Sequence, residues 1–261
     1  MRETRLKGLM RSLFFPCGSL RKILFGPLRG MLYRVGPVTG LSPFYSGTER
    51  NEQKIFKSII KKGDVVFDVG ANWGVHTLYF SKLVGSEGRV FSMEPGESAF
   101  HELEWHIEGN NLKNVRAFKI ALNKEDGESL LINGEATQTN TLLSALAHAQ
   151  ANQKMERVKV RTLDSLMKEC DLKQLNLIKL DVEGSEHNVL LGSENTINHY
   201  RPYWIIELHT PEQDVKVSKF LISKGYEISR IGNPPIKRFD VGWPEKDGVW
   251  GTILAKPSIH V

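Results

Sequence analysis

The stretch Val65-Val-Phe-Asp-Val-Gly-Ala-Asn-Trp-Gly74 decides the fold of this 261-residue chain. It reads as an apolar strand that ends in an acidic residue and is followed by a glycine-containing turn into a helix. Asp68 and Gly70 would then lie at the carboxyl edge of a sheet, where α/β folds bind their ligands. Gly70 and Gly74 carry no Cβ, so we expect the backbone of this turn to approach a ligand closely.

A second acidic residue, Glu94, ends the next apolar run, Arg89–Met93. An acceptor at that place suits the two hydroxyls of a ribose, which predicts a nucleoside-bearing cofactor. The turn lacks the third glycine of a dinucleotide fingerprint, and Asp68 suits a cationic ligand better than a pyrophosphate. S-adenosylmethionine carries a sulfonium and an ammonium and no phosphate, and so fits best. The alternative is a glycine-rich turn without a ligand.

Apolar strands and amphipathic helices alternate outward from this stretch over residues 49–254. Such alternation is typical of a doubly wound α/β fold, with a mostly parallel sheet and helices on both faces. We predict helices over residues 49–61, 74–84, 97–109, 186–193 and 214–224. We predict seven strands in the sheet, over residues 64–69, 89–93, 115–120, 175–180, 203–206, 226–231 and 249–254.

Residues 121–162 are less regular. Residues 129–132 and 157–160 read as strands, and the polar stretch 134–153 between them is either part of a substrate lid or a solvated loop. We divide the chain into a basic N-terminal extension (residues 1–48), an α/β domain (residues 49–256) and a C-terminal tail (residues 257–261).

The net charge of +5 is unevenly distributed. Residues 1–40 hold eight Lys or Arg side chains against one Glu, a net of +7, which leaves −2 for the rest of the chain. A nucleic-acid-binding domain carries its basic patch on the fold itself, so we expect no nucleic-acid partner. Apolar residues at helical spacing in residues 6–13 indicate an amphipathic segment on an anionic membrane or over the substrate cleft, or a cap packed on the domain.

Cys17 and Cys170 are the only cysteines, and they show neither metal-ligand spacing nor a framework of bridges. No apolar run approaches the ~20 residues that a membrane span needs. We therefore expect a cytoplasmic protein, peripheral at the membrane if residues 1–40 bind lipid.

Charged residues gather near two later strand ends. Asp181 falls at the end of its strand, where α/β sheets bind ligands, and alternates with Lys179 and Glu183. Glu207 and His209 follow the next strand in the same way. This cluster suits a general base, groups that position a substrate hydroxyl, or a divalent cation, but spacing alone supports no metal and we predict none. A buried Lys179 needs a partner, for which Glu207 is the candidate.

Five motifs together resemble the FkbM-type methyltransferase family over about residues 49–254. They are Asp68-Val-Gly-Ala-Asn-Trp-Gly74, Glu94-Pro95, Thr162-Leu-Asp-Ser165, Ile178-Lys-Leu-Asp-Val-Glu-Gly184 and the strand 202–207. The resemblance implies a Rossmann-like class I methyltransferase fold, whose last strand inserts antiparallel. It implies S-adenosylmethionine as cofactor and methyl transfer, most often to an oxygen of a polyketide, sugar or glycolipid.

The resemblance also implies roles for single residues. The cofactor-binding residues would be Asp68, Gly70, Asn72, Gly74, Glu94 and Asp126. The first four would cradle the methionine part, Glu94 would accept the ribose hydroxyls, and Asp126 would lie near the adenine. The catalytic residues would be Asp181, Glu183, Glu207 and His209. Trp73 would stack on the ligand or fill the pocket wall, and His76 is a further candidate whose alternative is a packing role.

Two other functions compete with the methyltransferase. A nicotinamide-dependent oxidoreductase predicts a third glycine after Gly74 and a Tyr-x-x-x-Lys pair, and neither is present. A non-catalytic scaffold of the same fold would dock on a membrane or partner through the basic N-terminus.

The acceptor, a small molecule or a glycan- or lipid-linked one, would be chosen by residues 134–153 and 232–248. There Trp243 suits a sugar face, a lipid chain or a homodimer contact.

Overall fold

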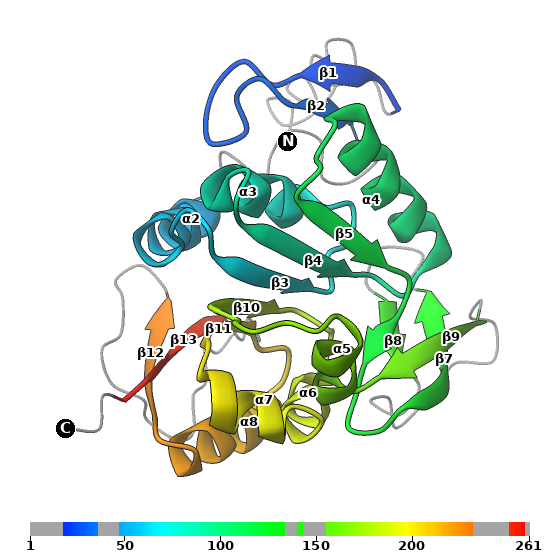
Figure 1. The fold of residues 1–261 in the computed structure, drawn as a ribbon. Helices are drawn as coiled ribbons and strands as arrows, with labels where there is room; N and C mark the ends of the chain where they lie inside the picture. Colours follow the sequence, from blue (N-terminus) through cyan, green and yellow to red (C-terminus); the bar gives the residue numbers. More distant parts are fainter. Residues whose placement is uncertain (1–17, 36–46, 134–139, 143–154, 232–250, 259–261) are drawn as a thin grey trace, which may run out of the picture.

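The computed structural model describes residues 18–35, 47–133, 140–142, 155–231 and 251–258 (Figure 1). Seven strands form the main sheet in the order β12-β13-β11-β10-β3-β4-β5. They are β3 (Val65–Val69), β4 (Arg89–Met93), β5 (Val115–Phe118), β10 (Leu177–Leu180), β11 (Tyr203–Glu207), β12 (Tyr226–Ile231) and β13 (Thr252–Pro257). Only β13 runs antiparallel to its neighbours, β11 and β12. The predicted seven-stranded, mostly parallel sheet with an inserted antiparallel last strand is confirmed.

Helices cover both faces of this sheet (Figure 1). They are α2 (Gly47–Ile59), α3 (Val75–Val84), α4 (Glu97–Gly109), α5 (Leu163–Glu169), α6 (Glu186–Leu191), α7 (Glu194–Tyr200) and α8 (Pro211–Ser223). Side chains alternate along β3 because successive residues of a strand point to opposite faces. Phe67 packs into the core under α5 to α8, while Val66 packs into the core under α2 and α3. Two of these helices, α5 and α7, were not predicted.

A second sheet of four strands, in the order β6-β9-β7-β8, lies at the carboxyl edge of the main sheet. Its strands are β6 (Ala121–Leu122), β7 (Gly127–Asn133), β8 (Asn140–Leu142) and β9 (Met155–Arg161). The predicted strands 129–132 and 157–160 lie within β7 and β9. The predicted strand 115–120 ends early, at Phe118, because the chain then leaves the main sheet and enters the second one. We placed acceptor-selecting loops at residues 134–153 and 232–248, and of these only residues 140–142, which form β8, lie within the described residues.

Residues 18–35 form a hairpin that packs against α4. Its strands, β1 (Leu20–Lys22) and β2 (Leu32–Arg34), pair antiparallel. The backbone N–H of Leu32 donates to Asn110 Oδ1 at 2.7 Å, and Tyr33 stacks on His106 with ring centroids 4.5 Å apart. Because Leu28 and Tyr33 join the same core as α2 and α3, the predicted boundary at residue 48 does not separate this hairpin from the domain.

The cap interpretation of the N-terminal extension therefore holds for residues 18–35, and the amphipathic pattern of residues 6–13 lies outside the described residues. The final strand reaches Pro257, one residue past the predicted end of the domain. Among the described helices, none has the length and apolar character needed to cross a membrane.

A buried ion pair fastens α8 to the outermost strand of the main sheet. Arg230 donates to Asp214 Oδ2 at 2.8 Å, and the two side chains are 4% and 3% exposed. Removing one partner of such a pair leaves an uncompensated charge in the interior, which is strongly destabilising.

We therefore expect Asp214→Ala to lower the free energy of unfolding by about 3 kcal/mol in urea denaturation. The matched control is Lys216→Ala, which breaks the exposed pair with Glu212 on the same helix and should cost less than about 1 kcal/mol. Equal losses in the two variants would contradict the structural role of the buried pair.

Candidate active site

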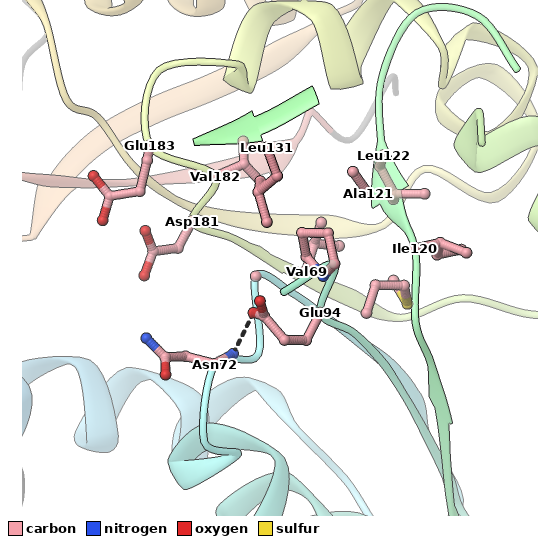
Figure 2. Close-up of a pocket in the computed structure, with 13 residues that line it drawn as sticks. Val69, Asn72, Glu94, Ile120, Ala121, Leu122, Leu131, Asp181, Val182 and Glu183 are labelled. Atoms are coloured by element: carbon pink, nitrogen blue, oxygen red, sulfur yellow. Dashed lines mark hydrogen bonds between the residues drawn. The ribbon is translucent and has the colours of Figure 1, made fainter. Parts of the chain in front are cut away.

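The predicted ligand pocket lies at the carboxyl ends of β3, β4 and β10, with the second sheet along one side. It holds about 580 Å³ of empty space, part of it open to solvent, which is within the usual range of small-molecule sites. It is lined by Val69, Gly70, Asn72, Met93, Glu94, Pro95, Ile120, Ala121, Leu122, Leu131, Asp181, Val182 and Glu183. Figure 2 shows the carboxylates of Asp181 and Glu183 at one end and the apolar Ile120, Ala121 and Leu122 at the other. The described lining includes three acids and no Lys, Arg or His.

The two glycines of the turn make room for protein atoms rather than for a ligand. A Cβ on Gly70 would lie 1.7 Å from the carbonyl oxygen of Asp181, and one on Gly74 would lie 2.5 Å from Leu103 Cδ1. Both glycines also have positive φ, at 76° and 84°, which side chains disfavour. The expected close approach is thus to neighbouring strands and helices, although Gly70 does line the pocket.

Glu94 joins the ends of β3 and β4. Its Oε2 accepts the backbone N–H of Asn72 at 2.9 Å, the bond drawn in Figure 2, and its Oε1 accepts the backbone N–H of Gly96 at 2.9 Å. The residue is only 4% exposed. Glu94 therefore holds the ends of β3 and β4 in place, and it also lines the pocket.

Asp68 lies behind the pocket and does not line it. Its Oδ2 accepts the hydroxyl of Thr77 at 2.6 Å, which ties the end of β3 to α3. Its Oδ1 is buried and has no hydrogen-bond partner among the described residues. Burial raises the pKa of Asp68, and the nearby charge of Lys179 opposes that rise. Of the four residues predicted to cradle the methionine part, Gly70 and Asn72 line the pocket, whereas Asp68 and Gly74 do not.

A histidine surrounded by carboxylates lies at the acidic end of the pocket. His209 Nε2 is 3.5 Å from Asp181 Oδ1 and 3.3 Å from Glu183 Oε2. On the other side of the ring, Nδ1 is 2.8 Å from Oε1 of the fully buried Glu186. The structure thus brings together three of the four predicted catalytic residues and adds Glu186, which we did not predict.

Lys179 is the buried cation beneath this cluster, but its partner differs from the prediction. Its Nζ donates to Asp181 Oδ2 at 2.9 Å rather than to Glu207. Burial works against the charged ammonium, yet the carboxylates of Asp181 and Asp68 outweigh it and raise the pKa of Lys179. Lys179 is therefore a fixed positive charge at neutral pH.

The protonation states within the cluster differ from residue to residue. Despite burial, the hydrogen bond to Glu186 and the surrounding carboxylates raise the pKa of His209 to about 9. Burial alone would raise the pKa of Asp181, but Lys179 and His209 lower it. Burial raises the pKa of Glu183, with Asp181 adding to the rise and His209 opposing it.

Glu207, the fourth predicted catalytic residue, does not line the pocket, but it lies near enough to Asp181 and Lys179 for their charges to act on it. Burial of its carboxylate and the negative charge of Asp181 raise the pKa of Glu207 to about 7. The residue as a whole is still exposed, so water screens these charges. The electrostatic interactions of Glu207 are therefore weaker than those of its buried neighbours. Glu52, a second carboxylate that we did not predict, accepts the hydroxyl of Thr252 at 2.7 Å and adds to the negative charge here.

The ligand atoms of Asp181, Glu183 and His209 lie within 4.8 Å of one another, a spacing that a metal ion could use. Metal ligands must be deprotonated, whereas His209 is held protonated and Asp181 already binds an ammonium. These states disfavour a cation, and the absence of a metal stays a prediction.

Three other candidate residues do not line the pocket, and His76 takes the packing role that was its alternative. His76 packs against Phe56 and Phe80, and burial with the charge of Lys179 lowers the pKa of His76 to about 3. Trp73 lies beside His106 and does not line the described pocket. Asp126 accepts the backbone N–H of Thr162 at 2.6 Å and the hydroxyl of Ser165 at 2.8 Å, so its carboxylate holds the start of α5 rather than the pocket.

A comparison with family models matches residues 68–228 to the methyltransferase FkbM domain. The chain belongs to the FkbM methyltransferase family. Both the resemblance and the enzyme class, an S-adenosylmethionine-dependent methyltransferase, are confirmed by this match and by the relatives.

The relatives are distant but share most of the domain. Methyltransferase 1 of Beauveria bassiana is 28% identical over 181 residues, 63% of this chain and 72% of that protein. Hexuronic acid methyltransferase AglP of Haloferax volcanii is 24% identical, over 66% of this chain and 68% of that protein. 2-O-methyltransferase NoeI of Sinorhizobium fredii is 26% identical, over 55% of this chain and 63% of that protein. The solved methyltransferase FkbM of Methylobacillus flagellatus aligns with a TM-score of 0.48 at 14% identity, covering 79% of this chain and 51% of that one.

The contact between Glu186 and His209 leads to a spectroscopic prediction. We expect Glu186→Gln to lower the pKa of His209 from about 9 toward the ordinary value near ~6.5, because an amide accepts the Nδ1 proton without a negative charge. The measurement is an NMR titration of the histidine ring signals. His199, on α7 and outside the cluster, is the internal control, and an unchanged titration of His209 would rule out Glu186 as the group that keeps the ring charged.

Proposed function

We propose that this enzyme binds S-adenosylmethionine in the pocket of Figure 2 and methylates a hydroxyl of a sugar or glycolipid at its acidic end. The observation that carries the proposal is the charge of the described lining, which holds three carboxylates and no basic side chain. A pyrophosphate would lack a partner there, whereas a sulfonium and an ammonium are favoured near carboxylates. The same observation disfavours the nicotinamide-dependent alternative.

The residues present fit the cofactor along the length of the pocket. Glu94 fixes the turn at Asn72 and also lines the pocket, where its carboxylate would accept the ribose hydroxyls. The apolar side chains of Ile120 and Leu122 suit the faces of an adenine. Asp181, with Asp68 behind it, supplies negative charge for the methionine end, and the buried Oδ1 of Asp68 has no partner among the described residues.

The bound cofactor would supply an activated methyl group, so the protein needs no nucleophile of its own. Its residues must hold the acceptor oxygen in line at about 3 Å, exclude water and take one proton. Lys179 and His209 are already protonated at neutral pH and cannot take it. Their role would be to neutralise and orient the carboxylates, which explains two buried or half-buried cations in an acidic site.

Glu183 is the carboxylate that we propose as general base. A base must lie within hydrogen-bond reach of the proton that it removes, and Glu183 lines the pocket whereas Glu207 does not. Burial raises the pKa of Glu183, which makes it a better proton acceptor than Asp181, whose pKa is lowered. Asp181 would position the acceptor through its fixed orientation between Lys179 and His209.

Sugars are the acceptor class that the relatives favour. The names of AglP and NoeI describe methylation of a hexuronic acid and 2-O-methylation, respectively. A cluster of hydrogen-bond acceptors at the mouth of the pocket suits a ligand with several hydroxyls. The scaffold alternative predicts an eroded pocket, and the intact Gly70, Asn72 and Glu94 weigh against it.

Calorimetric titration with S-adenosylmethionine tests the cofactor. We expect binding by the full chain and a loss of about tenfold or more in affinity for Glu94→Gln, because a charge-assisted acceptor is removed. Glu97→Gln is the matched control, since Glu97 is an exposed acid at the first position of α4 that pairs with Lys119. A folded sample that binds no cofactor would overturn the methyltransferase site and favour the scaffold.

Turnover with uronic acids and other sugars, followed as S-adenosylhomocysteine release, tests the base. We expect Glu183→Gln to lower kcat about 100-fold with little change in cofactor affinity, and Glu207→Gln to lower it less than about tenfold. In the unchanged enzyme the rate should rise with pH as Glu183 loses its proton, and Glu183→Gln should remove that limb. Loss of the limb in Glu207→Gln alone would transfer the role to Glu207.

A further inference from the structure

The hairpin β1–β2 exposes an apolar tip on a rigid base. Leu24 and Phe25, in the turn, are 65% and 72% exposed, and Leu20, on β1, is 48% exposed. They account for three of the six large apolar side chains that are exposed in the described parts of the chain, yet they lie within six residues. Single exposed apolar residues are ordinary, but such a concentration marks an interaction surface.

The tip is held in place by its own backbone and by the core. The backbone N–H of Ile23 donates to Met31 O at 2.8 Å, and that of Gly30 donates to Ile23 O at 2.7 Å. Ile23, Leu28 and Met31 turn inward and are buried, so the neighbouring Leu24 and Phe25 are the ones that face outward. Their exposure is therefore a property of a folded turn anchored on α4.

Positive charge surrounds the tip. Residues 18–35 contain four basic side chains and no Asp or Glu. Of these, Arg21, Lys22 and Arg29 are exposed. Lys82, in the last turn of α3, donates to the backbone carbonyl of Arg29 at 3.0 Å and brings a further cation to the same side. Apolar side chains that project from a basic surface match the chemistry of an anionic bilayer, with headgroups that pair with cations and acyl chains that take up the apolar tip.

We propose that this hairpin docks the enzyme on an anionic lipid surface, with Leu24 and Phe25 inserted and Arg21, Lys22 and Arg29 at the headgroups. The proposal is independent of the cofactor and the acceptor. The hairpin bonds to His106 and Asn110 at the C-terminal end of α4, whereas the pocket is lined by Glu94 and Pro95, just before that helix begins. Docking by the hairpin would therefore leave the pocket open.

Co-sedimentation of the full chain with vesicles tests this proposal. We expect binding to vesicles of phosphatidylcholine with phosphatidylglycerol, weak binding to phosphatidylcholine alone, and release by salt. Leu24→Ser/Phe25→Ser should weaken partitioning by at least about tenfold, since two apolar side chains no longer leave water. Lys22→Glu/Arg29→Glu should weaken it similarly on anionic vesicles only.

Ile222→Ser is the matched control, because Ile222 is 51% exposed on α8 and outside the hairpin. It should bind as the unchanged chain does, and all variants should keep their circular dichroism spectra and cofactor affinity. The proposal is overturned by absent vesicle binding, by binding that both hairpin variants retain, or by equal binding to uncharged vesicles. A dimer in sedimentation velocity that Leu24→Ser/Phe25→Ser dissociates would instead assign the tip to a second copy of the chain.

Discussion

The close approach of the Gly70 backbone to the carbonyl oxygen of Asp181 is the constraint on which the site depends. A Cβ at residue 70 would lie 1.7 Å from that oxygen, so β3 and β10 approach here as closely as backbone allows. The N–H of Gly70 donates to Met93 O at 2.9 Å, and the N–H of Asp181 donates to Val69 O at 3.0 Å. Three strand ends are thereby locked together, which brings Glu94 and Asp181 into the lining of one pocket.

Lys179 provides the electrostatic counterpart of that constraint. A buried ammonium is costly unless paired, and a group of buried carboxylates is equally costly without a cation. Lys179 lies among Asp68, Asp181 and Glu207, and each carboxylate favours its charged state. His209 plays the same part for Glu183 and Glu186. The acidic character of the pocket is thus sustained by two cations that do not line it.

Local patterns were enough to predict the main sheet, because its strands are continuous apolar runs followed by glycine turns and helices with apolar faces. The helix α5 also has a local signal that we passed over, the Thr162 side chain that accepts from the N–H of Ser165. The start of α7 has no such signal, since the side chain of Asp164 from α5 accepts the N–H groups of Asn195 and Thr196. The hairpin of residues 18–35 was missed because its short strands are recognisable only by their packing on α4.

The same distinction explains which site residues could be read from the chain. Asp181 and Glu207 lie at the ends of neighbouring parallel strands, and the ends of such strands meet at one edge of the sheet. The sequence therefore predicted that these two residues lie close together. Glu186 lies on α6 and reaches His209 only because the turn at Glu183 has φ of 52° and folds back, with the N–H of Gly184 donating to the Glu186 carboxylate at 2.9 Å. A left-handed glutamate within a tight turn is uncommon and carries a conformational cost. The turn lies beside the pocket, and its backbone conformation sets the direction of the Glu183 side chain. The orientation of the proposed base therefore depends on the geometry of this turn.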